Sequence, residues 1–188
     1  LNSRYIFDNF IEGKGNQFAK VAAMSVADTP GQTPYNPLLI YSKPGLGKTH
    51  LLQAIGNKII RQKPNMRVVY LTSEKFMLDF ISSIQKNHST DFINHYRNVD
   101  MLLLDDAQFF QSKEQTQEQF FHLFNDLFQK GKQIVLTTDR HPNELKGLKE
   151  RLVSRFQSGL IVDIQPPDLE TRIAILMKKG EDDGLEIP

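Results

Sequence analysis

Cysteine is absent from the 188 residues of this sequence, so the chain can form neither a disulfide framework nor a thiolate metal site. No apolar run is long enough to span a membrane. The first residues also lack the charged-then-apolar layout of a secretory signal. From these absences we expect a protein of the reducing cytoplasm.

Charge of one sign is also scarce, because 23 basic and 22 acidic side chains leave a net charge of only +1. Such a chain does not bind nucleic acid through bulk charge, so any contact with DNA must come from a local patch. The five histidines show no ligand spacing backed by carboxylates, and they predict no metal site. The hydrophobic content of 39% suits one core of ordinary size, or one domain and a fragment of the next.

The strongest signal in the chain is a loop that follows an aliphatic run. The loop contains Gly45 and Gly47, and Lys48 and Thr49 come directly before an amphipathic segment. This order predicts a strand, a phosphate-binding loop and a helix, in which backbone N–H groups hold phosphates, Lys48 adds positive charge and the Thr49 hydroxyl ligates Mg²⁺. Ser42 replaces the first glycine of the usual pattern, and we expect a small residue to fit there. The alternative is a chance Gly-Lys-Thr tripeptide at a turn.

Apolar and β-branched runs predict strands in five places. They lie at residues 38–41, 68–72, 101–104, 133–138 and 160–164. Segments with helical spacing separate these runs, and the strands are too apolar to face water. The sequence therefore predicts an α/β sandwich with a five-stranded, mostly parallel central sheet.

Helical periodicity assigns buried faces to three predicted helices. In the helix at residues 16–27 we expect these side chains to be buried: Phe18, Val21, Ala22 and Val26. We expect Ser73 to be the N-cap of a second helix that continues through residue 84. In this helix the side chains expected to be buried are Phe76, Met77, Phe80, Ile81 and Ile84. In the helix at residues 114–129 the shared face holds Phe120, Phe121, Phe124, Leu127 and Phe128. A single shared face favours a core position for these aromatic residues over a base-stacking platform.

Polar residues follow two of the predicted strands, at the edge where open parallel sheets bind ligands. We assign Asp105 to the Mg²⁺ shell and Asp106 to polarising the attacking water, with capping or surface acids as the alternative. A polar side chain of residues 137–140 holds that water or senses the γ-phosphate, and the alternative is an Asx-type turn before a proline. Arg151 and Arg155 lie one helical turn apart, either as surface ion-pair residues or with one as an arginine finger for a neighbouring subunit's site.

Taken together, six sequence blocks in order resemble the AAA+ nucleotide-binding domain of bacterial replication initiators of the DnaA family. The blocks are residues 35–38, 45–57, 69–76, 99–110, 138–140 and 151–156. The resemblance implies a three-layer P-loop NTPase fold of the AAA+ class that binds ATP or ADP with Mg²⁺. The division that we expect is an N-terminal arm and helix at 1–34, the nucleotide-binding subdomain at 35–180, and the start of a connection to a helical lid at 181–188.

The resemblance also implies the roles of individual residues. The implied nucleotide contacts come from the phosphate loop and from an arm that lines the adenine pocket: Gly45, Leu46, Gly47, Lys48, Thr49, His50, Ile11, Gly13 and Asn16. Thr49 and Asp105 are implied at the metal, and Asp106 is the second acid. Asp139 is an implied sensor, and Arg155, with Arg151 in the same subunit contact, is an implied finger acting on a neighbour's ATP.

Members of this family stack head to tail into a filament on origin DNA and help to melt it, with slow ATP hydrolysis as the off switch. Ile81, Lys113 and Gln115 match positions that touch single-stranded DNA, although Gln115 stands where some members carry arginine and Lys113 is as readily a solvated loop lysine. The chain stops where the lid should begin, so we expect weaker ATP affinity, hydrolysis and assembly than in the parent protein. A replicative helicase and regulators would bind through domains that are not in this sequence. The alternatives are a regulatory AAA+ module, or a helicase loader with little ATP turnover.

Overall fold

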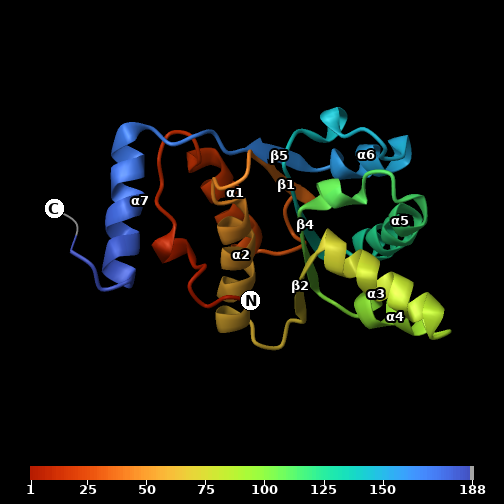
Figure 1. Cartoon of the computed structure of the whole chain (residues 1–188). Helices are drawn as coiled ribbons and strands as arrows, with labels where there is room; N and C mark the ends of the chain where they lie inside the picture. The colour runs from red at the N-terminus through yellow and green to blue at the C-terminus, as the bar shows by residue number, and fades with distance from the viewer. Residues whose placement is uncertain (187–188) are drawn as a thin grey trace.

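A single five-stranded sheet organises residues 1–186, the part of the chain that the computed structural model describes (Figure 1). Its strands are β1 (Leu38–Tyr41), β2 (Val68–Thr72), β3 (Met101–Asp105), β4 (Gln133–Thr138) and β5 (Leu160–Asp163). They run in the order β2-β3-β4-β1-β5, and every neighbouring pair is parallel. The predicted α/β class and the five predicted strands are therefore confirmed. The carboxyl ends of β1, β3 and β4 lie at one edge, where the predicted phosphate loop and acids meet.

One face of the sheet is covered by α1 (Gln17–Asp28) and α2 (Lys48–Gln62), with the N-terminal arm, residues 1–16, packed outside them (Figure 1). The expected burial of Phe18 and Val21 is wrong, because their side chains are 66% and 56% exposed. The helix instead turns a row of small residues inward: Ala19, Ala22, Ala23, Val26 and Ala27. Small side chains let α1 approach α2 closely, and this decides which face is buried.

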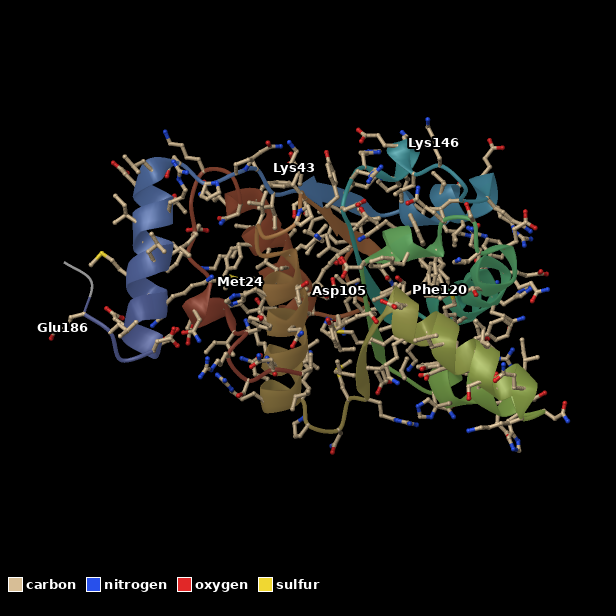
Figure 2. All side chains as sticks on the ribbon, in the orientation of Figure 1. Met24, Lys43, Asp105, Phe120, Lys146 and Glu186 are labelled. Atoms are coloured by element: carbon tan, nitrogen blue, oxygen red, sulfur yellow. The ribbon has the colours of Figure 1, made fainter. Side chains whose placement is uncertain are left out.

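The opposite face is covered by α3 (Ser73–Gln85), α4 (Ser89–Arg97), η2 (Ala107–Phe110), α5 (Glu114–Gln129), η3 (Pro142–Glu144) and α6 (Glu150–Phe156). Their buried rings form one aromatic cluster: Phe76, Phe80, Phe92, Tyr96, Phe110, Phe120, Phe124 and Phe156. Phe76 lies at its centre, with ring centroids of four neighbours 5.1 to 5.9 Å away. In Figure 2, Phe120 lies among these helices, away from α1 and α2. The core position predicted for Phe120 and Phe124 is confirmed.

Details of α3 and α5 differ from the sequence prediction. Ile81 and Ile84 are 42% and 45% exposed, because the α3–α4 pair extends past the sheet and its far end has no layer beneath it (Figure 1). Phe128, at the end of α5, is exposed as well. The N-cap of α3 is Thr72 and not Ser73, since the Thr72 side chain accepts the Lys75 N–H at 3.0 Å.

A last helix, α7 (Leu169–Asp182), stands beside the N-terminal arm at the far left of Figure 1. The Asp168 carboxylate caps it by accepting the Thr171 N–H at 2.8 Å. The expected divisions after residues 34 and 180 stay predictions, and residues 187 and 188 of the expected connection lie outside the described residues. Within residues 1–186, no helix combines the length and apolar character needed to cross a membrane.

Candidate functional site

The loop between β1 and α2 has the backbone of an anion-binding site. Gly45 and Gly47 have φ angles of 84° and 98°, which L side chains rarely adopt. A Cβ atom at Gly47 would also lie 3.0 Å from the ring of Phe10, so the arm closes against the loop. Because α2 begins at Lys48, its unpaired N–H groups face the space in front of the loop.

Ser42 fits at the position of the usual first glycine. Its side chain is buried, and its hydroxyl donates to the Lys43 carbonyl at 2.9 Å. Its N–H donates to the Thr138 carbonyl at 3.2 Å, so the residue continues the pairing of β1 with β4. Ser42 does not take a positive φ, and the backbone there does not require glycine.

Asp105, at the end of β3, is the centre of a buried hydrogen-bond network. Its carboxylate is 2% exposed, and its Oδ2 atom accepts the Thr49 hydroxyl at 2.8 Å and the Tyr70 phenol at 2.7 Å. Its Oδ1 atom accepts the Thr137 hydroxyl. The structure thus brings together the two residues proposed for the metal, Thr49 and Asp105, from segments 56 positions apart.

Asp106 lies beside this network in a left-handed backbone conformation, with φ 58° and ψ 53°. Its N–H donates to the Thr137 hydroxyl oxygen at 2.8 Å, and its carbonyl accepts the Ser73 hydroxyl. The Lys48 ammonium is 3.9 Å from Asp106 Oδ1. Burial, reinforced by the charge of Asp105, raises the pKa of the Asp106 carboxyl above its usual value, and Lys48 offsets only part of this effect.

Gln108 approaches the same carboxylate from η2. Its amide Nε2 donates to Asp106 Oδ1 at 3.3 Å. Its Oε1 atom is buried and has no hydrogen-bond partner among the described residues. A buried acceptor without a partner is rare, and a bound water or ligand group that donates a hydrogen bond would satisfy it.

A cavity of about 520 Å³ opens in front of the phosphate loop. Its walls come from the arm, the loop and α7, and they include these residues predicted to contact a nucleotide: Ile11, Asn16, Gly45, Leu46, Gly47, Lys48, Thr49 and His50. Gly13 does not line this cavity and packs against Thr171 of α7. Asn16 shapes the arm here, since it accepts the Gly13 N–H at 2.8 Å and donates to the Ile11 carbonyl at 2.9 Å.

His50 is held mainly by the arm. Its ring lies between those of Tyr5 and Phe10, at centroid distances of 5.1 and 5.3 Å. Its Nε2 atom is 2.8 Å from the Ile6 carbonyl, which can only accept a hydrogen bond, so Nε2 donates. Burial lowers the pKa of the imidazole, so the neutral form is favoured.

Asp139 follows β4 and pairs with Arg140 at 3.0 Å. The negative charge of Asp139 contributes to the raised pKa of Asp106. The two residues therefore belong to the same electrostatic environment.

Arg151 and Arg155 do not join the phosphate loop of their own chain. They lie in α6, on the other face of the sheet, with guanidinium carbons 4.5 and 5.8 Å from the centroid of the Phe121 ring. Both side chains are exposed. They form no salt bridge within the described residues 1–186.

The residues proposed for DNA contact lie on the same side as α6. Ile81 is an exposed residue of α3. Lys113 precedes the first turn of α5 and Gln115 lies in that turn, and both side chains are exposed. All three are outside the cavity.

The polar residues around Asp105 were only partly predictable. Thr137 belongs to the predicted polar stretch at residues 137–140, but nothing distinguishes it from its neighbours. Tyr70 has the pattern of an ordinary strand residue, and no motif marks it. Their partners are distant in sequence, so only the folded arrangement reveals them.

The donor atoms at this site fit Mg²⁺. Thr49 and Asp105 offer a hydroxyl and a carboxylate, the oxygen ligands that this ion prefers. Within the described part of the chain, no group of three or more His, Cys, Asp or Glu side chains could hold an ion. Mg²⁺ commonly takes one or two protein ligands and completes its shell with phosphates and water, and the residues present suit that arrangement.

Comparison with known proteins gives one family model and several solved structures that match most or all of the chain. A family model described as the bacterial DnaA ATPase domain matches residues 1–163. Domain III of the Thermotoga maritima replication initiation protein DnaA is 49% identical with a TM-score of 0.97, covering 100% of this chain and 78% of that one. AMPPCP-bound DnaA from Aquifex aeolicus is 43% identical with a TM-score of 0.92, covering 100% of this chain and 57% of that one.

A further solved structure, a replication initiator DnaA bound to AMPPCP and single-stranded DNA, is 42% identical with a TM-score of 0.91. This chain is covered completely and spans 58% of that relative. The DnaC helicase loader is only 18% identical, with a TM-score of 0.74 over 87% of this chain and 100% of that one. At that identity the likeness shows a shared fold alone.

Proposed function

The chain belongs to the family of bacterial DnaA ATPase domains, and from this membership we propose that it is the ATP-binding core of a chromosomal replication initiator. The observation that carries the proposal is the hydrogen bond from Thr49, which lines the cavity, to Asp105, at the acidic end of β3. This is the arrangement that a P-loop nucleotide site requires.

In this proposal the phosphates of ATP lie at the N-terminus of α2. The backbone N–H groups that follow Gly47 donate to them, and buried Lys48 neutralises their charge. Thr49 and Asp105 would hold Mg²⁺, which when bound neutralises charge on the β- and γ-phosphate oxygens. Ile11 and Asn16, across the cavity, take the base.

Asp106 is the proposed proton acceptor for the attacking water. Its raised pKa brings the carboxyl closer to the working pH, which suits a general base. Asp139 is the proposed sensor next to it. We propose that hydrolysis is slow in the isolated chain, because neither Arg151 nor Arg155 faces its own phosphate loop.

The same placement supports an arginine finger that acts between subunits. Arg155, with Arg151 beside it, would reach the ATP of the next subunit and couple nucleotide binding to head-to-tail assembly. Ile81, Lys113 and Gln115 would then meet single-stranded DNA on the assembled subunits. A related initiator was solved with AMPPCP and single-stranded DNA, which supports DNA binding in general and does not bear on these three positions. A replicative helicase and regulators are proposed partners of the longer protein, and the cytoplasm is its proposed location because its substrate is chromosomal DNA.

The alternative functions have less support. Relatives described as replication initiators are 42 to 49% identical, whereas the helicase loader shares only the fold. A regulatory module that has lost nucleotide binding would be favoured by a distorted phosphate loop. The structure accommodates Ser42 without such distortion.

Binding of a fluorescein-labelled oligo(dT) with AMPPCP and with ADP tests the proposed function. We expect cooperative binding with AMPPCP and weak binding with ADP. Arg155→Ala should remove the cooperativity and leave nucleotide affinity unchanged. Arg97→Ala, which removes a surface arginine paired with Asp126 at 3.8 Å, is the matched control. Equal DNA binding in ADP and AMPPCP, or full cooperativity in Arg155→Ala, would contradict the proposal.

A further inference from the structure

Gln117, near the start of α5, is a buried polar residue with no part in the nucleotide site. It is only 1% exposed, and its side-chain amide has three partners in the protein. The Nε2 atom donates to the carbonyls of Phe110 and Gly147 at 2.7 and 2.8 Å. The Oε1 atom accepts the Lys149 N–H at 2.9 Å. Both donor positions of the amide and one acceptor position are therefore used on backbone groups.

These three partners belong to two segments that are far apart in the sequence. Phe110 is the last residue of η2, the turn that directly follows Asp106. Gly147 and Lys149 lie in the loop between η3 and α6. One side chain therefore joins the turn after the second acid of the site to the loop that leads into the helix with the two arginines.

The start of α6 depends on a contact from outside the helix. The helix has only seven residues, which is too short to be stable alone, and its N-cap residue, Lys149, makes no side-chain cap hydrogen bond. Its buried side chains, Leu152 and Phe156, pack into the core on that face of the sheet. Packing thus fixes the inner side of α6, and Gln117 fixes the backbone from which the helix and Arg155 begin.

Loss of the Gln117 amide would affect one of its partners more than the other two. The carbonyls of Phe110 and Gly147 each accept a second backbone N–H, at 3.0 and 2.8 Å. The Lys149 N–H has no second partner among the hydrogen bonds of residues 1–186. Without the amide, the end of η2 keeps a hydrogen bond of its own, whereas the start of α6 loses the one that holds it.

We propose that Gln117 is a positioning residue for the arginine finger, because it fixes the start of the helix that carries Arg151 and Arg155. The inference rests on the proposed function, in which Arg155 acts on the ATP of a neighbouring subunit, and it names a residue on which that contact depends. Gln117 itself touches neither ATP nor DNA in this account.

Mixed subunits separate the finger from the site on which it acts. Lys48→Ala should lose its own ATP and keep its finger, so it serves as the finger donor. Arg155→Ala should keep ATP and lose its finger, so it serves as the acceptor. A mixture with excess donor should hydrolyse ATP faster than either variant alone, because each working site then combines two different subunits. Gln117→Met keeps the length of the side chain, removes its amide, and is introduced into one partner at a time.

The position of Gln117→Met in the mixture decides the expected result. In the donor it should lower the hydrolysis rate about ten- to hundredfold, because a misplacement of about 1 Å in a catalytic group can cost about 100-fold. In the acceptor it should leave the rate unchanged, since that subunit supplies the ATP and not the finger. A general loss of folded protein would instead lower the rate in both arrangements.

Gln133→Met is the matched control, and Lys149→Pro is a second variant. Gln133 is equally buried and also holds a loop, accepting the Gly31 N–H and donating to the Tyr35 carbonyl, both at 2.9 Å, but it lies at the start of β4. Its substitution should not change the rate in either partner. Lys149→Pro replaces the N–H that Gln117 accepts, at an exposed residue whose φ of −62° suits proline. It should lower the rate only in the donor, and it provides the test if Gln117→Met does not fold.

The outcomes distinguish the inference from the proposed function. If Lys48→Ala and Arg155→Ala together hydrolyse ATP and Gln117→Met in the donor does not change the rate, the positioning role is wrong and the proposed finger stands. An equal loss in donor and acceptor would also overturn the positioning role. If the first mixture is no faster than either variant alone, the finger between subunits fails, and the inference fails with it.

Discussion

The two faces of the sheet are packed with different kinds of side chains. On the α2 face, alanines and aliphatic residues pack around buried polar groups: Lys48, Gln53 and Asp105. On the opposite face, eight rings of the aromatic cluster pack against one another. Figure 2 shows the contrast, with Asp105 near the sheet at the middle of the molecule and Phe120 among the helices beyond it.

The contrast separates the face that stabilises the fold from the face that carries the proposed nucleotide site. Buried polar groups cost free energy unless they are hydrogen-bonded, so the α2 face holds Asp105 through Thr49, Tyr70 and Thr137. Aromatic residues bury large apolar areas and contact each other favourably, so the opposite face stabilises the fold. That face also presents α6 and the first turn of α5 to solvent, so the proposed nucleotide site and the proposed assembly surface lie on opposite sides of the sheet.

The largest expected effect comes from the aromatic cluster. Phe120→Ala should lower the free energy of unfolding by about 3–5 kcal/mol, because it removes a fully buried ring and leaves a cavity. Urea unfolding measures the loss. Phe128→Ala, at an exposed ring stacked on Phe124, is the control and should cost much less. The proposed division of roles between the two faces would be contradicted if Phe120→Ala left the free energy of unfolding unchanged. It would also be contradicted if Phe120→Ala abolished ATP binding while the protein remained folded.

On the α2 face we expect a smaller loss of stability with a functional consequence. Thr137→Val leaves Asp105 Oδ1 and the Asp106 N–H without their partner, at a cost of about 1–3 kcal/mol. Mg²⁺-dependent ATP binding should weaken as well. Thr138→Val is a control, since its hydroxyl donates only to the Arg140 carbonyl at 2.6 Å. Equal Mg²⁺-dependent ATP affinity of Thr137→Val and Thr138→Val would show that the hydrogen bonds of Thr137 do not support the nucleotide site.

Phe121→Leu tests whether the aromatic face also prepares the assembly surface. The substitution removes the ring that holds both guanidinium groups, each contact being worth about 0.5–1 kcal/mol at an exposed site. The two contacts together are worth about 1–2 kcal/mol, so the concentration needed for ATP-dependent assembly, followed by light scattering, should rise about five- to thirtyfold. ATP affinity of the single chain should stay the same, and a change in it would contradict the separation of the faces.

The smallest effect concerns the charge on Asp106. Its folded-state pKa is raised, so the stability linked to this group is present below the ordinary carboxyl value of 3.8 and is lost as the pH rises through the folded pKa. Asp106→Asn stays neutral and should therefore be more stable than the unaltered chain at pH 7, by less than about 1 kcal/mol. Thermal unfolding at several pH values checks this. The difference should vanish at pH values below 3.8, and a lower stability at pH 7 would show that the Lys48 contact outweighs burial.

The sheet was predictable because each strand is a short apolar run between turn residues. The buried faces of α1 and α3 were only partly predictable. Periodicity identifies an apolar stripe but does not tell which layer covers it, so Phe18 and Ile81 were misplaced. In α1 the small residues that pack against α2 determine which face is buried. In α3 the end that extends past the sheet leaves its apolar residues exposed. Both outcomes depend on how neighbouring elements pack, which periodicity does not contain.

The phosphate loop and the acid pair were predictable because their chemistry requires particular residue types at adjacent positions. The rest of the network depends on register between distant segments. Tyr70 reaches Asp105 only because Thr72 lies opposite Asp105, and Thr137 does so only because β4 lies between β1 and β3. The position of Arg155 over Phe121 likewise follows from the packing of α6 on α5.

Titration calorimetry of ATP with Mg²⁺ into the chain and into Lys48→Ala is the most direct test of the central claim, that the α2 face is a working nucleotide site. Lys58→Ala is the control, because it removes a lysine of the same helix that pairs with Asp28. The account predicts saturable binding by the unaltered chain and by Lys58→Ala, and none by Lys48→Ala. Equal binding by Lys48→Ala, or no binding by the unaltered chain, would contradict it.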